Sequence, residues 1–236
     1  MTDFKMVYDT QAEQYEYLVA HEDYEGNILK TLGKIRPLIP TMTVVELGAG
    51  TGRITRLLAP YVVRITACDI SPHMLSIAQK KLSETAWHNW KLTACDNRAV
   101  SLKGELADLV IAGWSVGHSV GWYPDSWREE IGKALAEMRR LLRPNGTIIL
   151  LETQGTNHET PHPPTPQLAE FFDWLVQTQG FEFTWIRTDY RYPTVADAVA
   201  SVRFFFGEEM AADVQRKDSP IVPECTGIWW WQLPKE

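Results

Sequence analysis

The feature that most restricts the fold of this chain is the stretch of residues 44–53, VVELGAGTGR, in which an apolar run meets an acid and then three alternating glycines. The run is followed by the helical spacing of Ile54, Leu57 and Leu58, so it predicts a buried strand, a tight turn and the start of a helix. Glycine suits such a turn because the backbone can adopt positive φ and a ligand can approach it closely. The free N–H groups at the helix start would attract an anionic ligand group, so the stretch predicts a cradle for a nucleotide-type ligand.

The spacing of the glycines narrows the choice of ligand. It is Gly48-x-Gly50-x-Gly52, and Arg53 stands where the dinucleotide pattern G-x-G-x-x-G would have its third glycine. A glycine turn alone is weak evidence for a particular ligand, so acids elsewhere in the chain are needed to identify it.

Two further apolar segments, residues 63–69 and 90–96, each run into an acid. Asp69 lies 21 residues after Gly48, and a carboxylate at about that distance from such a turn can accept hydrogen bonds from both ribose hydroxyls. Asp96, at the end of the second segment, is suited to the exocyclic amine of adenine. Together the turn and the two acids favour a ligand that contains adenosine.

Four motifs in this order resemble those of class I S-adenosylmethionine-dependent methyltransferases of the small-molecule type. They span roughly residues 40 to 152 and are the segments 46–52 (ELGAGTG), 69–75 (DISPHML), the acid Asp96 and the segment 141–146 (LLRPNG). The resemblance implies a Rossmann-like α/β fold, doubly wound, with a mostly parallel seven-stranded sheet whose last strand is antiparallel. It implies one methyltransferase domain over residues 1–236, with an N-terminal helical lid (1–40), a cofactor-binding core (41–152) and a C-terminal substrate-side part (153–236).

The same resemblance implies S-adenosylmethionine as cofactor and S-adenosylhomocysteine as product. The glycine turn would hold the methionine part, Asp69 the ribose, and Ile70 and Met74 would pack on the adenine, whose edge Asp96 and the Asn97 backbone would bind. The predicted cofactor-binding residues are Tyr15, Glu46, Gly48, Ala49, Gly50, Thr51, Gly52, Asp69, Ile70, Met74, Asp96, Asn97, Arg98 and Trp114.

The segment 108–112 predicts a fourth strand, which delivers the chain to a loop over residues 113–119. Ligands of doubly wound sheets bind beyond the carboxyl ends of the strands, so this loop should meet the reactive methyl group. It contains His118, the candidate catalytic residue, because an imidazole can take a proton from an acceptor near neutral pH. The alternative is that His118 hydrogen-bonds within the loop or touches only the cofactor. The predicted substrate-binding residues are Tyr8, Ser115, Trp122 and Tyr123.

Composition and absent motifs limit the acceptor and the location. The formal charge of −7 disfavours nucleic acid and an anionic membrane surface, and the fourth-strand loop lacks the Asn/Asp-Pro-Pro-aromatic run of nucleobase methyltransferases. Ala112 and Gly113 stand where magnesium-dependent catechol methyltransferases place an aspartate, so no metal is expected. The chain begins without signal-peptide features and has no long apolar run, so we expect a cytoplasmic protein with a small-molecule substrate. The sequence does not indicate an oligomeric state.

The remaining segments lead to more general expectations. Residues 1–20 carry tyrosines that either close over the cofactor or cover the domain edge, and residues 153–166 form a long polar loop that is either a lid or a mobile surface. After a helix (167–179) and a strand (181–187), one helical stretch is expected over residues 194–214. In the last strand, residues 227–233, the three adjacent tryptophans are assigned to packing on both faces of a covered strand.

The leading hypothesis is therefore a small-molecule methyltransferase that acts by direct displacement. The alternatives are a non-catalytic, regulatory protein that binds S-adenosylmethionine and, further behind, an NAD-dependent oxidoreductase. Arg53 in place of a glycine and Glu46 before the turn speak against the oxidoreductase. An RNA methyltransferase is disfavoured by the charge and by the fourth-strand loop.

Overall fold

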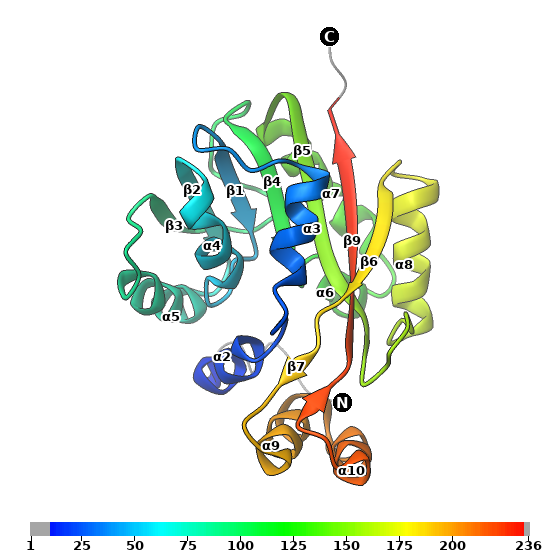
Figure 1. Cartoon of the computed structure of the whole chain (residues 1–236). Helices are drawn as coiled ribbons and strands as arrows, with labels where there is room; N and C mark the ends of the chain where they lie inside the picture. Colours follow the sequence, from blue (N-terminus) through cyan, green and yellow to red (C-terminus); the bar gives the residue numbers. More distant parts are fainter. Residues whose placement is uncertain (1–9, 234–236) are drawn as a thin grey trace.

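A seven-stranded sheet with the strand order β3-β2-β1-β4-β5-β9-β6 forms the centre of the computed structural model, which describes residues 10–233 (Figure 1). Its strands are β1 (Thr43–Leu47), β2 (Arg64–Asp69), β3 (Trp90–Ala94), β4 (Ala107–Gly113), β5 (Leu142–Thr156), β6 (Glu182–Arg187) and β9 (Glu224–Gln232). β1 to β5 pair in parallel, whereas β9 is antiparallel to both of its neighbours, β5 and β6. This confirms the predicted mostly parallel sheet with an antiparallel last strand.

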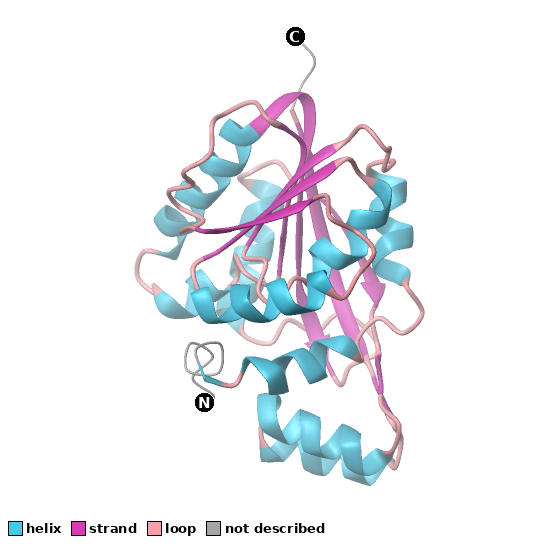
Figure 2. Cartoon of the chain, turned by 90° about the vertical axis from the view of Figure 1, so that its left-hand side faces the viewer, coloured by secondary structure: helices cyan, strands magenta, loops and turns pink. Residues whose placement is uncertain are grey.

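Helices cover both faces of the sheet, as the edge view in Figure 2 shows. One face carries α3 (Asn27–Ile35), α4 (Arg53–Leu58) and α5 (Pro72–Ser83), with the short 3₁₀ turn η1 (Ala59–Tyr61) after α4. The other face carries α6 (His118–Trp122), α7 (Trp127–Leu141) and α8 (Pro166–Gln177). Both layers of helices bury their apolar stripes on strands that are themselves apolar on both faces, so the fold is doubly wound.

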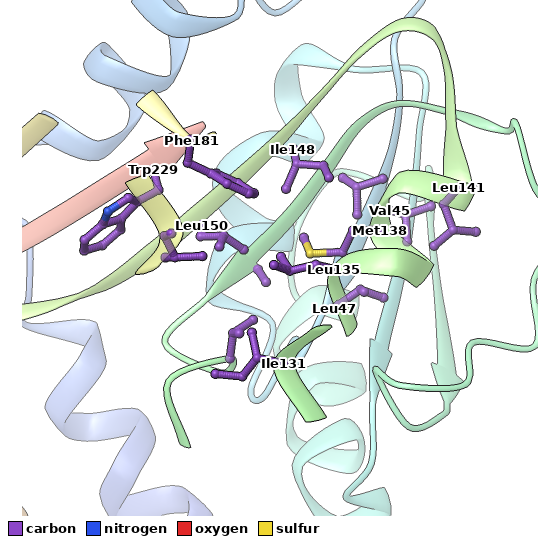
Figure 3. Packing of buried hydrophobic residues seen from close by; sticks show 14 of the residues in the cluster. Val45, Leu47, Ile131, Leu135, Met138, Leu141, Ile148, Leu150, Phe181 and Trp229 are labelled. Carbon is purple, nitrogen blue, oxygen red and sulfur yellow. The ribbon is translucent and has the colours of Figure 1, made fainter. Parts of the chain in front are cut away.

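The larger apolar cluster lies between α7 and the sheet (Figure 3). Ile131, Leu135 and Met138 recur along α7 at helical spacing and pack against side chains of β1 and β5, such as Leu47 and Leu150. All five are at most 1% exposed, so this contact fixes the central strands that position the site.

A separate assembly lies at the end of the sheet where the parallel strands finish, at the bottom of Figure 1. It consists of α2 (Ala12–Ala20), α9 (Val195–Phe206), α10 (Glu208–Lys217) and a small antiparallel pair, β7 (Tyr190–Arg191) with β8 (Ile221–Val222). Its own apolar cluster joins Leu18 of α2 to Val199 of α9 and Val214 of α10. The first helix of the described chain and the helices near its end therefore form one body over the carboxyl ends of the strands.

The structure corrects three sequence-based expectations about elements. The helical stretch expected over residues 194–214 is two helices, because Gly207 breaks it with φ +94° and ψ 177°, a conformation that side chains rarely adopt. The loop expected over 113–119 becomes helical at His118, where α6 begins. β5 continues to Thr156 because β9 supplies hydrogen-bonding partners beyond Glu152, so the loop expected from 153 begins after Thr156.

The three tryptophans of β9 lie as predicted on a strand that has neighbours on both sides. Trp229 is fully buried in the α7 cluster, where the partly buried Trp231 also packs, and Trp230 packs on the opposite face. Within residues 10–233 there is no helix with the length and apolar character needed to cross a membrane.

Candidate functional site

A cavity of about 670 Å³ opens at the carboxyl ends of β1, β2 and β4, close to the point where the strand order reverses. Every predicted site residue in the described part of the chain except Gly52 lines it. These are Tyr15, Glu46, Gly48, Ala49, Gly50, Thr51, Asp69, Ile70, Met74, Asp96, Asn97, Arg98, Trp114, Ser115, His118, Trp122 and Tyr123. The remaining predicted residue, Tyr8, lies outside the described residues.

Gly52 lies outside the cavity lining and has a packing role. It is the N-cap of α4 with φ +82°, and a Cβ there would lie 3.2 Å from the Cβ of Ala78 on α5. The backbone conformation and the close approach of the two helices explain the glycine, and its contact with the cofactor stays a prediction.

The other two glycines shape the cavity floor. Gly48 has φ +72°, and a Cβ on it would lie 2.3 Å from the Cβ of Ser115, so the turn after β1 and the loop after β4 are in direct contact. Gly50 has φ +53°, and its N–H donates to Asp69 Oδ2 at 2.7 Å. The backbone of this turn is thus closely packed against the loop after β4, and on its cavity side a ligand can approach it closely.

Asp69 is engaged through both carboxylate oxygens. Oδ2 accepts the hydrogen bond from Gly50, and Oδ1 accepts one from the Ser71 backbone N–H at 2.8 Å, at the start of α5. Burial raises the pKa of Asp69, and these backbone hydrogen bonds act in the opposite direction. Asp69 therefore fixes the glycine turn to the end of β2, and a spare lone pair on each oxygen can still accept a ligand hydroxyl.

Glu46 is a buried carboxyl at the end of β1. It accepts a hydrogen bond from the Thr55 hydroxyl of α4, and burial raises its pKa to about 8. The hydrogen bond from Thr55 and the Arg56 charge act against this rise in the pKa. A positively charged ligand group in the cavity would favour the ionised form of Glu46.

Asp96 is held ionised by its neighbour. The Arg98 guanidinium lies 2.6 Å from Asp96 Oδ2 and 2.5 Å from Glu130 on α7, and the pKa of Asp96 is lowered by the Arg98 hydrogen bonds. Arg98 also lies over the Tyr123 ring, 5.1 Å from its centroid. Arg98 therefore orients the acid on the cavity wall, which leaves Asp96 as an acceptor for a ligand N–H.

The loop after β4 supplies the wall next to the glycine turn. Trp114 adopts φ +50°, its N–H donates to Leu151 O at 2.7 Å, and the Arg53 guanidinium lies 4.2 Å from the centroid of its ring. His118 stacks on Trp122 with 5.2 Å between ring centroids. Burial lowers the pKa of His118 to about 4 and a hydrogen bond to the Trp114 backbone acts in the opposite direction, so the imidazole is neutral at pH 7 and is bonded within the loop.

Arg53 and the acid that holds it were not predicted as site residues. Arg53 lines the cavity and pairs with Glu22 at 2.7 Å, and a second pair joins Arg56 to Glu16 at 2.6 Å. Glu16 and Glu22 belong to the N-terminal segment around α2, so these pairs fix that segment to α4 beside the cavity. The sequence showed Arg53 only as a departure from a glycine pattern, and nothing in the spacing pointed to Glu22.

The contribution of the C-terminal part to the cavity is indirect. Among the described residues after Thr153, none lines the cavity, and the connection runs through Phe205 of α9, whose ring centroid lies 5.6 Å from that of Tyr15. Within residues 10–233, including the cavity, no group of three His, Cys, Asp or Glu side chains is arranged to hold a metal ion.

Comparison with known proteins agrees with this geometry. A family profile described as a methyltransferase domain matches residues 44–146. The chain is 31% identical over 137 residues to an uncharacterized methyltransferase of Schizosaccharomyces pombe. This match covers 58% of this chain and 49% of that protein. It is 27% identical over 146 residues to the malonyl-[acyl-carrier protein] O-methyltransferase of Halorhodospira halophila, which covers 60% and 45%. The chain thus spans about half the length of these curated relatives.

Two solved structures share the fold across nearly the whole chain. Phosphoethanolamine N-methyltransferase 2 of Haemonchus contortus, in complex with phosphomonomethylethanolamine and S-adenosylhomocysteine, has a TM-score of 0.64 at 14% identity and covers 99% of this chain and 59% of that one. The [4+2]-cyclase SpnF has a TM-score of 0.63 at 15% identity and covers 98% and 96%. Residues 44–146 therefore match a methyltransferase domain, and the chain has the fold of these solved structures.

Proposed function

We propose that this protein binds S-adenosylmethionine in the cavity and transfers its methyl group to a small-molecule acceptor by direct displacement. The observation that carries the proposal is that a single cavity brings together the glycine turn, Asp69, Asp96 and His118, which come from four separate segments of the chain. A glycine cradle and two acids fit an adenosine ligand, and a neutral imidazole beside them fits the removal of a proton.

Different cavity residues would contact different parts of the cofactor. Gly48 and Gly50 leave the backbone bare for close approach, and the buried Glu46 supplies negative charge when a cationic ligand group enters. Asp69 would hold the ribose hydroxyls and Asp96 the adenine amine. The exposed Ile70 and the buried Met74, both on the cavity wall, provide apolar surface for the adenine.

The acceptor would enter beside the loop after β4. The bound cofactor supplies an electrophilic methyl group on a sulfonium. Ser115, Trp122 and Tyr123 would align the acceptor, and His118 would take the proton that the acceptor loses. The methyl–sulfur bond would break as the acceptor gains the methyl group, and its electron pair would remain on the sulfur of S-adenosylhomocysteine. The net charge of −7 and the small-molecule ligand of the Haemonchus contortus structure support an acceptor of low molecular weight.

The position of α2 supports a role for this helix as a cover of the cofactor site within a single methyltransferase domain. Tyr15 and Val19 of α2 line the cavity, and the ion pairs of Glu16 and Glu22 to α4 hold the helix in place. We propose that α2 closes one side of the cofactor site and excludes water from it.

Parallel calorimetric titrations with S-adenosylmethionine, S-adenosylhomocysteine and NADH test the cofactor. One-to-one binding of the first two without NADH is the expected result, and binding of NADH alone would favour the oxidoreductase. A mass-spectrometric screen for methylated products across amines, alcohols, thiols and carboxylic acids then tests transfer. Tight cofactor binding without any product would favour the second candidate, a regulatory binding protein. The likeness to SpnF, which is named as a cyclase, supports keeping this candidate, because it shows that the fold also occurs in a protein that is not named a methyltransferase.

A further inference from the structure

Glu152 is a buried acid near the carboxyl end of β5 that the proposed function does not use. It is 5% exposed, and its Oε1 accepts a hydrogen bond from the Gly117 backbone N–H at 2.8 Å. The backbones of the two preceding residues, Val116 and Ser115, lower the pKa of this carboxyl as well. The loop after β4 therefore meets this buried side chain through its backbone, most directly at Gly117.

The same loop forms the wall of the cavity. Trp114, Ser115 and Val116 line it, and His118 follows directly as the first residue of α6. Glu152 does not line the cavity, so it acts on the loop from behind. Glu152 therefore has no direct contact with a ligand in the cavity.

The carboxylate lies so close to the loop that it determines which residue can stand there. A Cβ on Gly117 would lie 2.9 Å from Glu152 Oε2, which is closer than real Cβ contacts. Gly117 has φ −60°, so its backbone conformation does not require glycine. The need for glycine at this position comes from the carboxylate.

The loop backbone stabilises the buried charge. Burial raises the pKa of Glu152 to about 7, and the backbone of the loop acts in the opposite direction, first through the Gly117 hydrogen bond. A carboxylate that accepts several backbone N–H bonds makes charge-assisted hydrogen bonds, which are stronger than those between neutral groups. The loop and the acid therefore stabilise each other.

We infer that Glu152 is a positioning residue, which fixes the backbone of residues 115–117 and thereby places the His118 imidazole at the edge of the cavity. The contacts alone support the claim that Glu152 fixes this loop. The consequence of this contact for methyl transfer rests on the proposed function.

Hydrogen exchange measured by mass spectrometry on the peptide that covers residues 114–122 tests the inference without a known acceptor. In Glu152→Leu, with S-adenosylhomocysteine present, the amides of 115–117 should exchange about tenfold faster or more, the change expected when charge-assisted hydrogen bonds are lost. Glu152→Gln keeps one acceptor oxygen and should give a smaller increase. Unchanged protection of this peptide in Glu152→Leu would overturn the inference.

Glu224 on β9 offers a matched control. It is also a buried carboxyl, 1% exposed, and its side chain accepts a hydrogen bond from Thr153 rather than from loop amides. Glu224→Leu should leave exchange at residues 115–117 as in the wild type, with melting temperatures recorded for every variant. If Glu224→Leu releases these amides as much as Glu152→Leu does, general loosening of the core explains the effect and the inference fails.

A double-mutant cycle with Gly117→Ala gives a second, reciprocal test. The added methyl group should release the loop in the wild type, because it meets Glu152, and should have little further effect in Glu152→Ala. Additive effects of the two changes on exchange would contradict the inference.

A kinetic readout separates the inference from the proposed function. If an acceptor is found, Glu152→Gln should lower kcat about tenfold or more while the KM for S-adenosylmethionine stays within about threefold, since only the loop is displaced. If the wild type binds no S-adenosylmethionine, the proposed function fails while the exchange result still decides the role of Glu152. An active wild type with unchanged kcat in Glu152→Gln would leave the proposed function intact and overturn the catalytic part of the inference.

Discussion

Asp69 has a structural role in addition to the ligand contact proposed for it. It closes the glycine turn through Gly50 and starts α5 through Ser71, and it also lines the cavity. Substitution of such a residue removes a ligand contact and loosens the turn that makes other contacts. Its effect on binding should therefore exceed that of one hydrogen bond between neutral groups.

Asp69→Ala is predicted to weaken binding of S-adenosylmethionine by about 1.5–3 kcal/mol, because charge-assisted hydrogen bonds to the ribose are lost. Calorimetric titration measures the change. Asp108→Ala is the matched control: Asp108 also accepts a backbone hydrogen bond, from Thr43 at 2.7 Å, but it does not line the cavity, so its binding constant should match the wild type. An unchanged constant in Asp69→Ala would place the ribose elsewhere.

His118→Ala is predicted to lower the rate of methyl transfer by about 10²–10⁴-fold with cofactor affinity retained, because a general base is lost. Since the pKa of His118 is about 4, this base is already neutral at pH 6, and the wild-type rate should not fall between pH 7.5 and 6 through its protonation. Single-turnover rates across this range provide the measurement. Loss of cofactor binding in the variant would instead make His118 part of the cofactor pocket.

At the scale of elements, the assembly over the carboxyl ends of the strands depends on one backbone break. α9 and α10 make their antiparallel contact because Gly207 turns the chain between them, and α9 in turn meets α2 beside the cavity. No atom lies within 4 Å of a Cβ built on Gly207, so the requirement for glycine there is one of backbone conformation alone.

Gly207→Ala is predicted to destabilise the protein by about 1–3 kcal/mol, the cost of forcing a side chain into this backbone region. Gly132 lies within α7 and also has open space around its Cβ, so Gly132→Ala should stabilise by about 0.5–1 kcal/mol. Urea denaturation of both variants measures the pair. Equal effects of the same sign would show that the conformation of Gly207 is not the cause.

At the scale of the whole molecule, three buried carboxyls give stability a shared dependence on pH. Burial raises the pKa of Glu46 to about 8, of Glu152 to about 7 and of Glu224 to about 8, each from 4.5. Between pH 4.5 and these values the native state binds more protons than the unfolded chain, so stability falls as pH rises. His118 acts in the opposite direction, but only between about pH 4 and 6.5.

The free energy of unfolding is therefore predicted to be lower at pH 8 than at pH 6.5, because the three carboxyls outweigh the small effect of His118 that remains in this range. In Glu224→Gln one of the three ionisations is absent, so the decline should be smaller than in the wild type. Urea titrations at the two pH values measure both. A wild type that is equally or more stable at pH 8 would contradict the raised pKa values.

The central sheet and most of the candidate site could be predicted from the chain alone, because both depend on local chemistry. Glycines that allow positive φ must follow β1, and the acids Asp69 and Asp96 must follow apolar runs that can only be strands. Parallel strands end at one edge of a sheet, so these local signals converge in space without further information. The order of the motifs then indicated the resemblance to methyltransferases.

The tertiary structure alone decided which residues hold the site in place. Glu22 meets Arg53 across 31 positions and Glu152 meets Gly117 across 35, and both pairs depend on how helices and strands pack rather than on any spacing in the sequence. The division of α9 from α10 was likewise hidden, because a lone glycine within an apolar helical pattern does not show its φ. Local rules determine the strands, the turns and the acids that line the cavity, whereas burial and long-range contacts decide the partners of these residues and their pKa values.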